Sequence, residues 1–321
     1  MTRIAPAAGT ALLLSLGACS PMSTAQEPVL AGAGKPTQIA VDLSHVYVAA
    51  DQGGHGTLTR VDKERWESQT VCALPGPIEQ LVLAVDSVYW LLEHQASEAP
   101  VVVIQKAEKT ANAKVEPYLR SQQRVTSFAL DATHLYWSQA GDPKDPDEAR
   151  TPGILRAMDP SSTPTNVVTR LKGEPHRVTL GGADVYWVTK EPDGSSAVMS
   201  WPKMGGDPSE LLVLHRNEVQ GVLPSLAATD DGVYVLDNRE LILLSPEGKK
   251  SRRVRHGFVA ESPDLVFDYR YLYFRTAHGL MRMKPDGSDF LPFAPDGQGP
   301  FAVGADFVFW FDGDKVLRAE K

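Results

Sequence analysis

The stretch GGADVYWVTK, residues Gly181–Lys190, contains a phrase that recurs along the chain: a small or acidic turn followed by an aromatic strand residue. Aligning the aromatic residue gives seven copies: IAVDLSHVYV (Ile39–Val48), LVLAVDSVYW (Leu81–Trp90), FALDATHLYW (Phe128–Trp137), VTLGGADVYW (Val178–Trp187), AATDDGVYV (Ala227–Val235), LVFDYRYLYF (Leu265–Phe274) and FAVGADFVFW (Phe301–Trp310). The aligned aromatics are Tyr47, Tyr89, Tyr136, Tyr186, Tyr234, Tyr273 and Phe309, which lie 36 to 50 residues apart. A repeat of this length is typical of the four-stranded blade of a β-propeller.

Each copy predicts four short strands. An apolar run, a tight turn and the aromatic strand are followed by a third strand such as GILRAMDP (Gly153–Pro160) and a more polar fourth strand such as ESQTVCAL (Glu67–Leu74). The last copy stops after its third strand, at Lys321. The segment Pro28–Ala31 has the pattern of a fourth strand, so we expect it to pair with the last blade and close the ring. The sequence therefore predicts an all-β, seven-bladed β-propeller over residues 28–321.

The bulk composition fits this prediction. Hydrophobic residues make up 42% of the 321 positions, and 26 Gly and 24 Pro are spread along the chain, as short strands joined by turns require. The net charge of −8 argues against a nucleic-acid partner, because phosphate binding needs a basic face. We expect a monomer without a cofactor.

The first twenty residues, MTRIAPAAGTALLLSLGACS, are typical of an export signal. One early Arg3 precedes an apolar stretch that is too short to span a bilayer. The end of the stretch, Leu16-Gly17-Ala18-Cys19, resembles the lipobox of bacterial lipoproteins. This resemblance implies removal of residues 1–18, acylation of Cys19, a short tether over residues 19–27, and anchoring to the outer membrane of a Gram-negative cell. The alternative is an ordinary signal peptide with a chance cysteine.

Two segments carry a resemblance to a known repeat. The segments His134–Pro160, with HLYWSQ and GILRAMDP, and Tyr271–Ser288, with YLYFRT and LMRMKPDGS, resemble YWTD-type and related propeller repeats. The full tetrad is absent, and the receptor members of that family have six blades, so the resemblance implies a fold and not a ligand. The combination of lipobox and propeller is also similar to lipoproteins that serve as scaffolds in outer-membrane protein assembly.

Most repeated residues are interpreted as structural. The aromatic column is predicted to pack between blades, with a stacking surface for a ligand as the alternative. Asp42, Asp131 and Asp268 precede their aromatics by five residues, and we expect them to accept backbone N–H groups in the turn rather than bind cations. Cys72 alternates with apolar neighbours and is predicted to be a buried strand residue.

The candidate binding face is the one onto which the connectors between blades open. We expect Glu79, Gln80, Arg124, His176 and Arg177 to surround the mouth of the central channel. The same face would carry His94, and also Asp142 and Asp145 of the long loop Gly141–Gly153. In that loop Pro143 and Pro146 break the spacing of a calcium site, and the histidines lack close ligand spacing. We therefore predict neither a metal site nor a catalytic residue.

A basic run, GKKSRRVRHG, extends over Gly248–Gly257. It places Lys249, Lys250, Arg252, Arg253 and Arg255 on an outer strand. One interpretation is contact with anionic lipid headgroups or an acidic partner. The alternative is a charged edge strand that prevents pairing with another chain.

Together these features predict a membrane-anchored envelope lipoprotein that acts as a non-enzymatic binding or scaffold module for a protein or glycan. The alternative is a propeller lyase or hydrolase that acts on an envelope polysaccharide. That alternative requires titratable groups that converge at the channel mouth. A sensory or structural domain without a small ligand is a third possibility.

Overall fold

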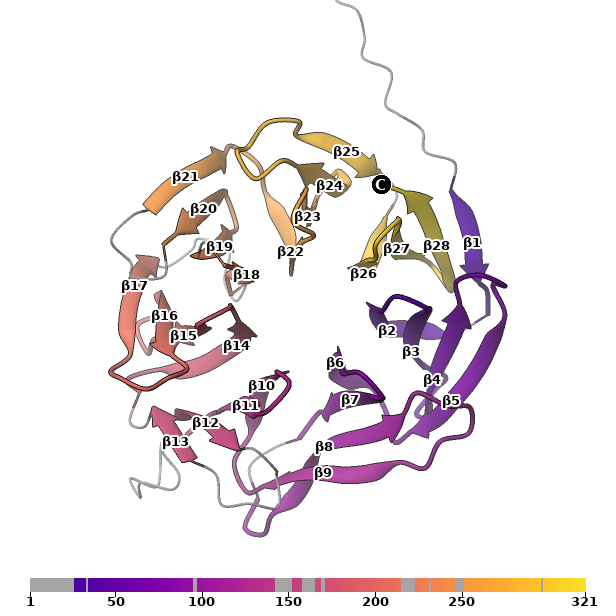
Figure 1. Ribbon diagram of the computed structural model, residues 1–321, viewed down its shortest axis with the longest axis horizontal. Coiled ribbons are helices and arrows are strands. Elements are labelled where there is room, and N and C mark those ends of the chain that lie inside the picture. Colours follow the sequence, from indigo (N-terminus) through magenta and orange to yellow (C-terminus); the bar gives the residue numbers. More distant parts are fainter. Residues whose placement is uncertain are drawn as a thin grey trace, which may run out of the picture.

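The computed structural model describes residues 26–32, 34–94, 97–141, 152–157, 165–168, 171–214, 223–230, 232–245, 251–295 and 297–321. These residues form seven antiparallel sheets of four strands, arranged radially around a central axis (Figure 1). The prediction of a seven-bladed propeller with four-stranded blades is confirmed. The predictions for Cys19 and for residues 1–18 lie outside the described residues, as do those for Asp142, Asp145, Lys249 and Lys250.

Each of the first three blades runs from an inner to an outer strand. Blade 1 is β2 (Lys35–Val41), β3 (His45–Asp51), β4 (Gly56–Asp62) and β5 (Ser68–Leu74); blade 2 is β6 (Ile78–Leu83), β7 (Ser87–Leu92), β8 (Val101–Glu108) and β9 (Glu116–Ser121); blade 3 is β10 (Val125–Leu130), β11 (Leu135–Gln139), β12 (Gly153–Ala157) and β13 (Thr165–Val168).

The other four blades follow the same order. Blade 4 is β14 (Glu174–Leu180), β15 (Asp184–Lys190), β16 (Ser196–Pro202) and β17 (Ser209–Leu214); blade 5 is β18 (Ser225–Thr229), β19 (Gly232–Asp237), β20 (Glu240–Leu244) and β21 (Ser251–His256); blade 6 is β22 (Ala260–Phe267), β23 (Leu272–Thr276), β24 (Gly279–Met283) and β25 (Leu291–Ala294); blade 7 is β26 (Gln298–Val303), β27 (Phe307–Asp312), β28 (Lys315–Glu320) and β1 (Glu27–Leu30).

The N-terminal strand closes the ring, as the sequence predicts. β1 pairs antiparallel with β28, with Glu27 opposite Arg318 and Leu30 opposite Val316. The strand begins one residue before the predicted start. The Arg318 guanidinium also forms an ion pair with Glu27 and lies 3.6 Å from the ring centroid of Trp66 in blade 1. The first and last strands are therefore fixed to each other and to the next blade.

The hydrophobic core is divided into layers between blades. Seven clusters of buried side chains occur among the described residues, and each one joins two neighbouring blades. The aromatic column supplies much of this packing: six of its members are at most 5% exposed. Tyr89 is the exception, since it is half-buried and its ring packs edge-on to Tyr118 at 4.7 Å. The packing interpretation of the column is confirmed.

The single described cysteine is also a core residue. Cys72 lies on β5 and is 5% exposed, in the layer between blades 1 and 2. Burial raises the pKa of its thiol to about 11, so the thiol stays protonated at neutral pH. The prediction of a buried strand residue is confirmed.

The two faces of the disc differ in their connections. Because each blade is an antiparallel meander, the turns between its first and second strands and between its third and fourth strands lie on one face, which we call the turn face. The loops between second and third strands and the connectors between blades lie on the other face, which we call the channel face.

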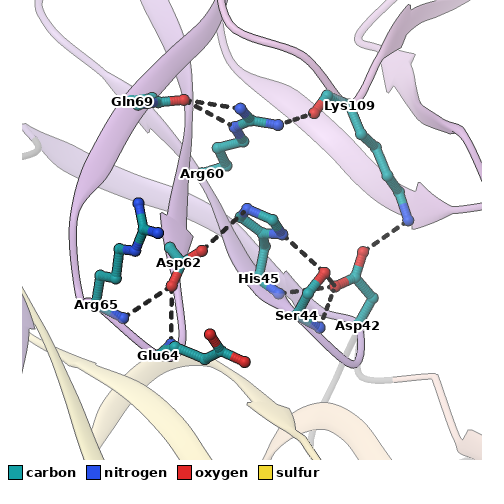
Figure 2. A network of polar contacts seen from close by, with 9 residues as sticks. All are labelled: Asp42, Ser44, His45, Arg60, Asp62, Glu64, Arg65, Gln69 and Lys109. Carbon is teal, nitrogen blue, oxygen red and sulfur yellow. Dashed lines mark hydrogen bonds and ion pairs between the residues drawn. The ribbon is translucent and has the colours of Figure 1, made fainter.

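On the turn face, an aspartate of one blade binds the next blade. Asp42 accepts hydrogen bonds from the backbone N–H groups of Ser44 and His45, and its second oxygen lies 2.7 Å from Lys109 Nζ of blade 2 (Figure 2). Burial alone would raise the pKa of Asp42, but Lys109 and the two N–H groups lower it to about 2. Arg60 of blade 1 also donates to the Lys109 carbonyl.

The same contact recurs at two other blade boundaries. Asp131 pairs with Lys203 at 3.6 Å, and Asp268 pairs with Lys321 at 2.6 Å. Each of these acids also accepts backbone N–H groups within its own turn. The structural interpretation of the turn acids is confirmed, and their bonds to the next blade are an additional finding.

Candidate binding site at the central channel

One position of the repeat surrounds the channel axis. It lies two residues before the inner-strand residue that pairs with the aromatic of each blade. The seven residues at this position, which we call the channel ring, are Gln38, Gln80, Ser127, Arg177, Ser225, Asp264 and Pro300. In six blades the pairing of the inner strand is irregular at or beside this residue. Bulges of this kind redirect side chains, and here they lie next to the channel.

The channel ring encloses a cavity of about 490 Å³. All ring residues except Ser225 line it, together with Glu79, Thr126, His176 and an apolar portion that includes Leu226 and Phe301. The inner strands that carry these residues surround the centre of the disc in Figure 1. A concave site of this volume, with a few polar groups on a partly apolar wall, has the size and character of a small-ligand pocket.

In the first three blades, the ring residues also connect neighbouring blades. Gln38 Nε2 donates to the Glu79 carbonyl at 3.0 Å. The Gln80 amide donates to the Phe128 carbonyl at 2.8 Å and accepts from its N–H at 3.0 Å. Ser127 Oγ accepts from the Val178 N–H at 2.9 Å. These bonds fix the orientation of the side chains that border the cavity.

The ring residues of blades 4 and 6 carry opposite charges. Arg177 has a positive φ of 55°, an uncommon conformation for a residue other than glycine. Burial lowers the pKa of Arg177, and the negative charge of Asp264 acts in the opposite direction. The small Ser225 of blade 5 lies between them in the ring order. The strained backbone and the buried guanidinium are features that commonly accompany functional sites.

A second group of charges lies at the channel mouth. Arg124 Nη1 is 3.2 Å from Glu174 Oε1, and the same oxygen is 3.5 Å from His176 Nε2. Burial, followed by the positive charges of Arg124, Arg177 and Lys190, lowers the pKa of His176 to about 4. The imidazole is therefore neutral at pH 7.

Glu79 is shifted toward its neutral form as well. Burial by the channel wall raises the pKa of its carboxyl group, and the charge of Arg124 partly offsets this effect. Glu93 raises the pKa of Glu79 and His94 lowers it, so all four groups lie within electrostatic range of one another. Neutral acids and neutral imidazoles can both donate and accept hydrogen bonds.

The structure thus brings together Glu79, Arg124, His176 and Arg177. His94 lies near Glu79, but its Nε2 is held by the backbone, 2.9 Å from the Gln123 carbonyl and 3.3 Å from the Val125 nitrogen. Sequence reasoning missed Gln38, Ser127, Glu174 and Asp264. Three of them, Gln38, Ser127 and Asp264, belong to the channel ring. The repeat alone locates them, because each lies two residues before the inner-strand residue that pairs with the aromatic of its blade.

The hydroxyl groups of Ser127 and Thr126 at the cavity are bonded to neighbouring hydroxyls and backbone atoms. Ser127 Oγ and Ser138 Oγ bond to each other at 2.8 Å, and Thr126 Oγ1 bonds to Ser138 and to the Pro175 carbonyl. None of these bonds is to a base, which a nucleophilic serine needs within hydrogen-bond reach. Among the described residues, no three His, Cys, Asp or Glu side chains are placed to hold a metal ion.

The basic strand β21 is engaged with its neighbours. Arg253 Nε lies 2.5 Å from Glu240, Arg252 donates to the Pro285 carbonyl at 3.1 Å, and Arg255 donates to the Gly287 carbonyl at 3.3 Å. The Arg255 guanidinium also lies 4.1 Å from the ring centroid of Phe290. The contacts of Arg252 and Arg255 fasten blade 5 to blade 6, whereas Arg253 pairs within blade 5. Arg253 additionally borders a hollow of about 670 Å³ between these blades.

The described part of the chain has no helix of the length and hydrophobicity that a membrane crossing requires. No protein-family model matches the sequence, and no curated protein is significantly similar to it.

Solved structures are similar in fold at low sequence identity. A puromycin-hydrolyzing peptidase of Mycobacterium tuberculosis has a TM-score of 0.63 and 11% identity over 91% of this chain and 53% of that one. A gluconolactonase of Xanthomonas campestris has a TM-score of 0.50 and 10% identity over 92% and 89% of the two chains. The WD40 domain of Neurospora crassa Pan2 has a TM-score of 0.59 and 11% identity over 92% and 96%.

The chain spans about half the length of the puromycin hydrolases it matches, whose covered shares are 50% to 53%. At these identities the likeness shows the propeller fold alone. The similar structures include both hydrolases and a WD40 domain, so they do not choose between an enzyme and a binding module.

Proposed function

We propose that this protein is a lipid-anchored lipoprotein of the bacterial cell envelope that binds a glycan at its channel face without transforming it. The observation that carries the proposal is the channel ring. It places different side chains at one repeated position of the backbone, around a cavity of ligand size. Side chains that only pack are repeated from blade to blade, whereas groups that meet a single ligand on the axis need not be.

The chemistry of the cavity wall favours an uncharged sugar unit of the glycan, rich in hydroxyl groups. The two carboxylates, Glu79 and Asp264, are offset by Arg177 within the wall and by Arg124 at the mouth. Gln38 and Gln80 are held with their amides at the cavity, and an amide NH₂ has two donors. Such planar polar groups can bond to neighbouring sugar hydroxyls, while Phe301 offers an apolar surface to the face of a sugar ring.

A second candidate function is hydrolysis or lyase cleavage of an envelope polysaccharide. It is favoured by one observation: burial shifts Glu79 and His176 toward their neutral forms at the same cavity. A carboxyl group whose pKa is raised and a neutral imidazole at one cavity are the kinds of group that general acid–base catalysis uses. In this case Glu79→Gln would abolish product formation while the glycan still binds.

The experiment is a binding screen of the detergent-solubilised full chain. Three probes are used: purified peptidoglycan sacculi, soluble muropeptides and lipopolysaccharide core oligosaccharide, with co-sedimentation or calorimetry as the readout. Arg177→Gln and Glu79→Gln should each weaken the binding of the selected probe at least about tenfold, since a hydrogen bond to a charged group is worth roughly 1.5–3 kcal/mol. Thermal melting of both variants checks that the fold is retained.

The matched controls are Arg120→Gln and Glu108→Gln, which change exposed residues of blade 2 that do not line the cavity. Both should bind like the unsubstituted protein. Equal binding by all four variants, or no binding of any probe, would overturn the proposal. New reducing ends or unsaturated sugars in the incubated sample would favour the lyase or hydrolase instead.

The anchor is tested separately. Cys19→Ala should leave the protein without lipid and largely uncleaved, so mass spectrometry of membrane fractions should find the full-length precursor. Normal processing of this variant would contradict lipidation and leave glycan binding unaffected.

A further inference from the structure

The turn face exposes large apolar side chains. The four most exposed in the described part of the chain are Met204 at 97%, Val85 at 89%, Leu43 at 88% and Tyr269 at 81%. Leu43, Val85 and Tyr269 lie at the tips of the turns β2–β3, β6–β7 and β22–β23, and Met204 follows β16. All four therefore lie on one face of the disc, although they come from four different blades.

Three of these side chains belong to a continuous arc. The same turn position carries Tyr269 in blade 6, Ala305 in blade 7, Leu43 in blade 1, Val85 in blade 2 and Ala132 in blade 3. The remaining two blades have Gly182 and Asp230 there. Five consecutive blades thus present an apolar turn tip, which we call the apolar arc. Clustered apolar exposure of this kind marks a contact surface, whereas single exposed residues need no explanation.

At three of the five tips of the arc, the carboxylate beside the apolar residue is paired. Leu43 and Tyr269 each follow an aspartate that binds an ammonium group of the next blade, Lys109 at 2.7 Å and Lys321 at 2.6 Å. Ala132 follows Asp131, which faces Lys203 at 3.6 Å. A surface that covers the arc therefore meets no isolated carboxylate at these three tips, which lowers the cost of excluding water there, while Asp86 and Asp306 beside the other two tips are exposed.

The N-terminal strand enters the propeller from the same face. Glu27, the first residue of β1, pairs with Arg318 near the end of β28, and β28 runs toward the turn face. Lys321, three residues beyond Arg318, bonds to Asp268, which precedes Tyr269 of the arc. The described chain thus enters the domain at Glu27, on the face that carries the arc.

The segment between Cys19 and Glu27 is short. Eight residue steps separate Cys19 from Glu27, and a fully extended chain spans at most roughly 26–29 Å over that length. An anchor at Cys19 would hold the turn face close to the membrane surface and leave the channel face toward the solvent. Tyr269 and the half-buried Trp66, which contacts Arg318, are the side-chain types that prefer the membrane–water interface.

We infer that the apolar arc rests on the lipid bilayer surface, so that the domain is held by two signals, the acyl chains at Cys19 and the turn tips. This inference rests on the proposed lipid anchor. A single weak signal gives reversible membrane binding, and a second one stabilises both the attachment and the orientation. The channel mouth then points away from the membrane, where it meets its ligand.

The test separates the arc from the anchor. The 28 strands of the described residues lie between Glu27 and Glu320, so a chain that begins at Ser20 retains the seven blades but lacks Cys19. This chain is sedimented with vesicles of phosphatidylethanolamine and phosphatidylglycerol. It should bind weakly, and the triple variant Leu43→Ser, Val85→Ser, Tyr269→Ser should lower the bound fraction at least about fivefold, because apolar area buried in the interface drives binding.

The matched control is Val101→Ser, Val213→Ser, Val259→Ser, which removes exposed apolar side chains that lie outside the turn face. It should bind vesicles like the parent chain. Equal sedimentation of the parent and the arc variant would overturn the inference. So would a concentration-dependent dimer that is lost only in the arc variant, because a second copy would then cover the arc.

The two ideas fail in different ways. If Cys19 is not lipidated but the arc contacts membranes, the chain from Ser20 still binds vesicles through the arc, while Cys19→Ala is processed normally. If the anchor is real and the arc is not, the lipidated protein stays in the membrane fraction and the arc variant changes nothing in the vesicle assay.

Discussion

The two faces of the propeller use the same repeat in opposite ways. On the turn face, one contact recurs: Asp42 with Lys109, Asp131 with Lys203, and Asp268 with Lys321. On the channel face, one backbone position carries Gln, Gln, Ser, Arg, Ser, Asp and Pro in successive blades. A bond between neighbouring blades joins the same two surfaces at each boundary, so the same pair of residue types can form it each time. A ligand on the axis meets each blade from a different side, so each blade can contribute a different group.

The contrast also holds within the channel ring itself. Gln38, Gln80 and Ser127 bond to the next blade, as the turn-face aspartates do. Arg177 and Asp264 carry opposite charges that attract each other across an intervening blade. We therefore expect the half of the ring formed by blades 4 to 6 to contribute most to ligand selectivity.

The largest expected effect is on the channel face and appears on acidification. The pKa of His176 is about 4 in the folded protein and 6.5 when unperturbed, so the unfolded chain binds the proton first. The stability contributed by the neutral imidazole is therefore present above pH 6.5 and is lost as the pH falls to 4, by about 3 kcal/mol. Urea unfolding between pH 7 and pH 4 should show this loss relative to His176→Gln. Parallel pH profiles for the two proteins would contradict it.

The turn face should respond in a lower pH window. The pKa of Asp42 is lowered from 3.8 to about 2, so its contribution is present above pH 3.8 and is lost as the pH falls to 2. Asp42→Asn should cost about 2 kcal/mol at pH 7, and its deficit should disappear near pH 2. The variant should keep the slope between pH 6.5 and 4 that His176 produces. A deficit that persists unchanged at pH 2 would mean that the charge of Asp42 is not the cause.

The repeated features of the molecule can be predicted from the sequence, whereas the features that differ between blades are harder to predict. The blade count, the packing of the aromatic column and the closure by β1 are encoded in local patterns that recur seven times. Because the strand pattern recurs seven times, a blade whose own pattern is weak can still be recognised by its alignment with the other copies. Pro28–Ala31 could be recognised only because the last copy lacks its fourth strand.

The site depends on contacts through space, which the sequence does not show directly. Glu79, Arg124, His176 and Arg177 could be expected at the mouth because connectors open there. The attraction between Arg177 and Asp264, by contrast, joins residues 87 positions apart in the sequence. The bond from Asp42 to Lys109 also joins two blades, and the turn pattern predicts only the bonds of Asp42 within its own turn.

A smaller effect is expected where the channel ring connects two blades. The Gln80 side chain satisfies both the N–H and the carbonyl of Phe128. Gln80→Leu should lower the free energy of unfolding by about 1 kcal/mol, because two backbone groups must then find water in the cavity. Chemical denaturation at pH 7 measures this loss. Ser225→Ala provides a comparison within the ring, at a residue that does not line the cavity. A loss above about 3 kcal/mol for Gln80→Leu would show that the bridge holds the ring together rather than only orienting a side chain.

The smallest effect on stability is expected at the apolar arc, and its smallness is the informative result. Leu43 is 88% exposed, so Leu43→Ser removes almost no buried surface and should change the free energy of unfolding by less than about 0.5 kcal/mol. Asp42→Asn at the neighbouring residue should lower the free energy of unfolding several times more, since Asp42 binds the next blade. Chemical denaturation of the soluble chain compares the two. A large loss for Leu43→Ser would mean that the arc stabilises the fold. A negligible loss would show that Leu43 does not stabilise the fold, which the inferred contact of the arc with the bilayer requires.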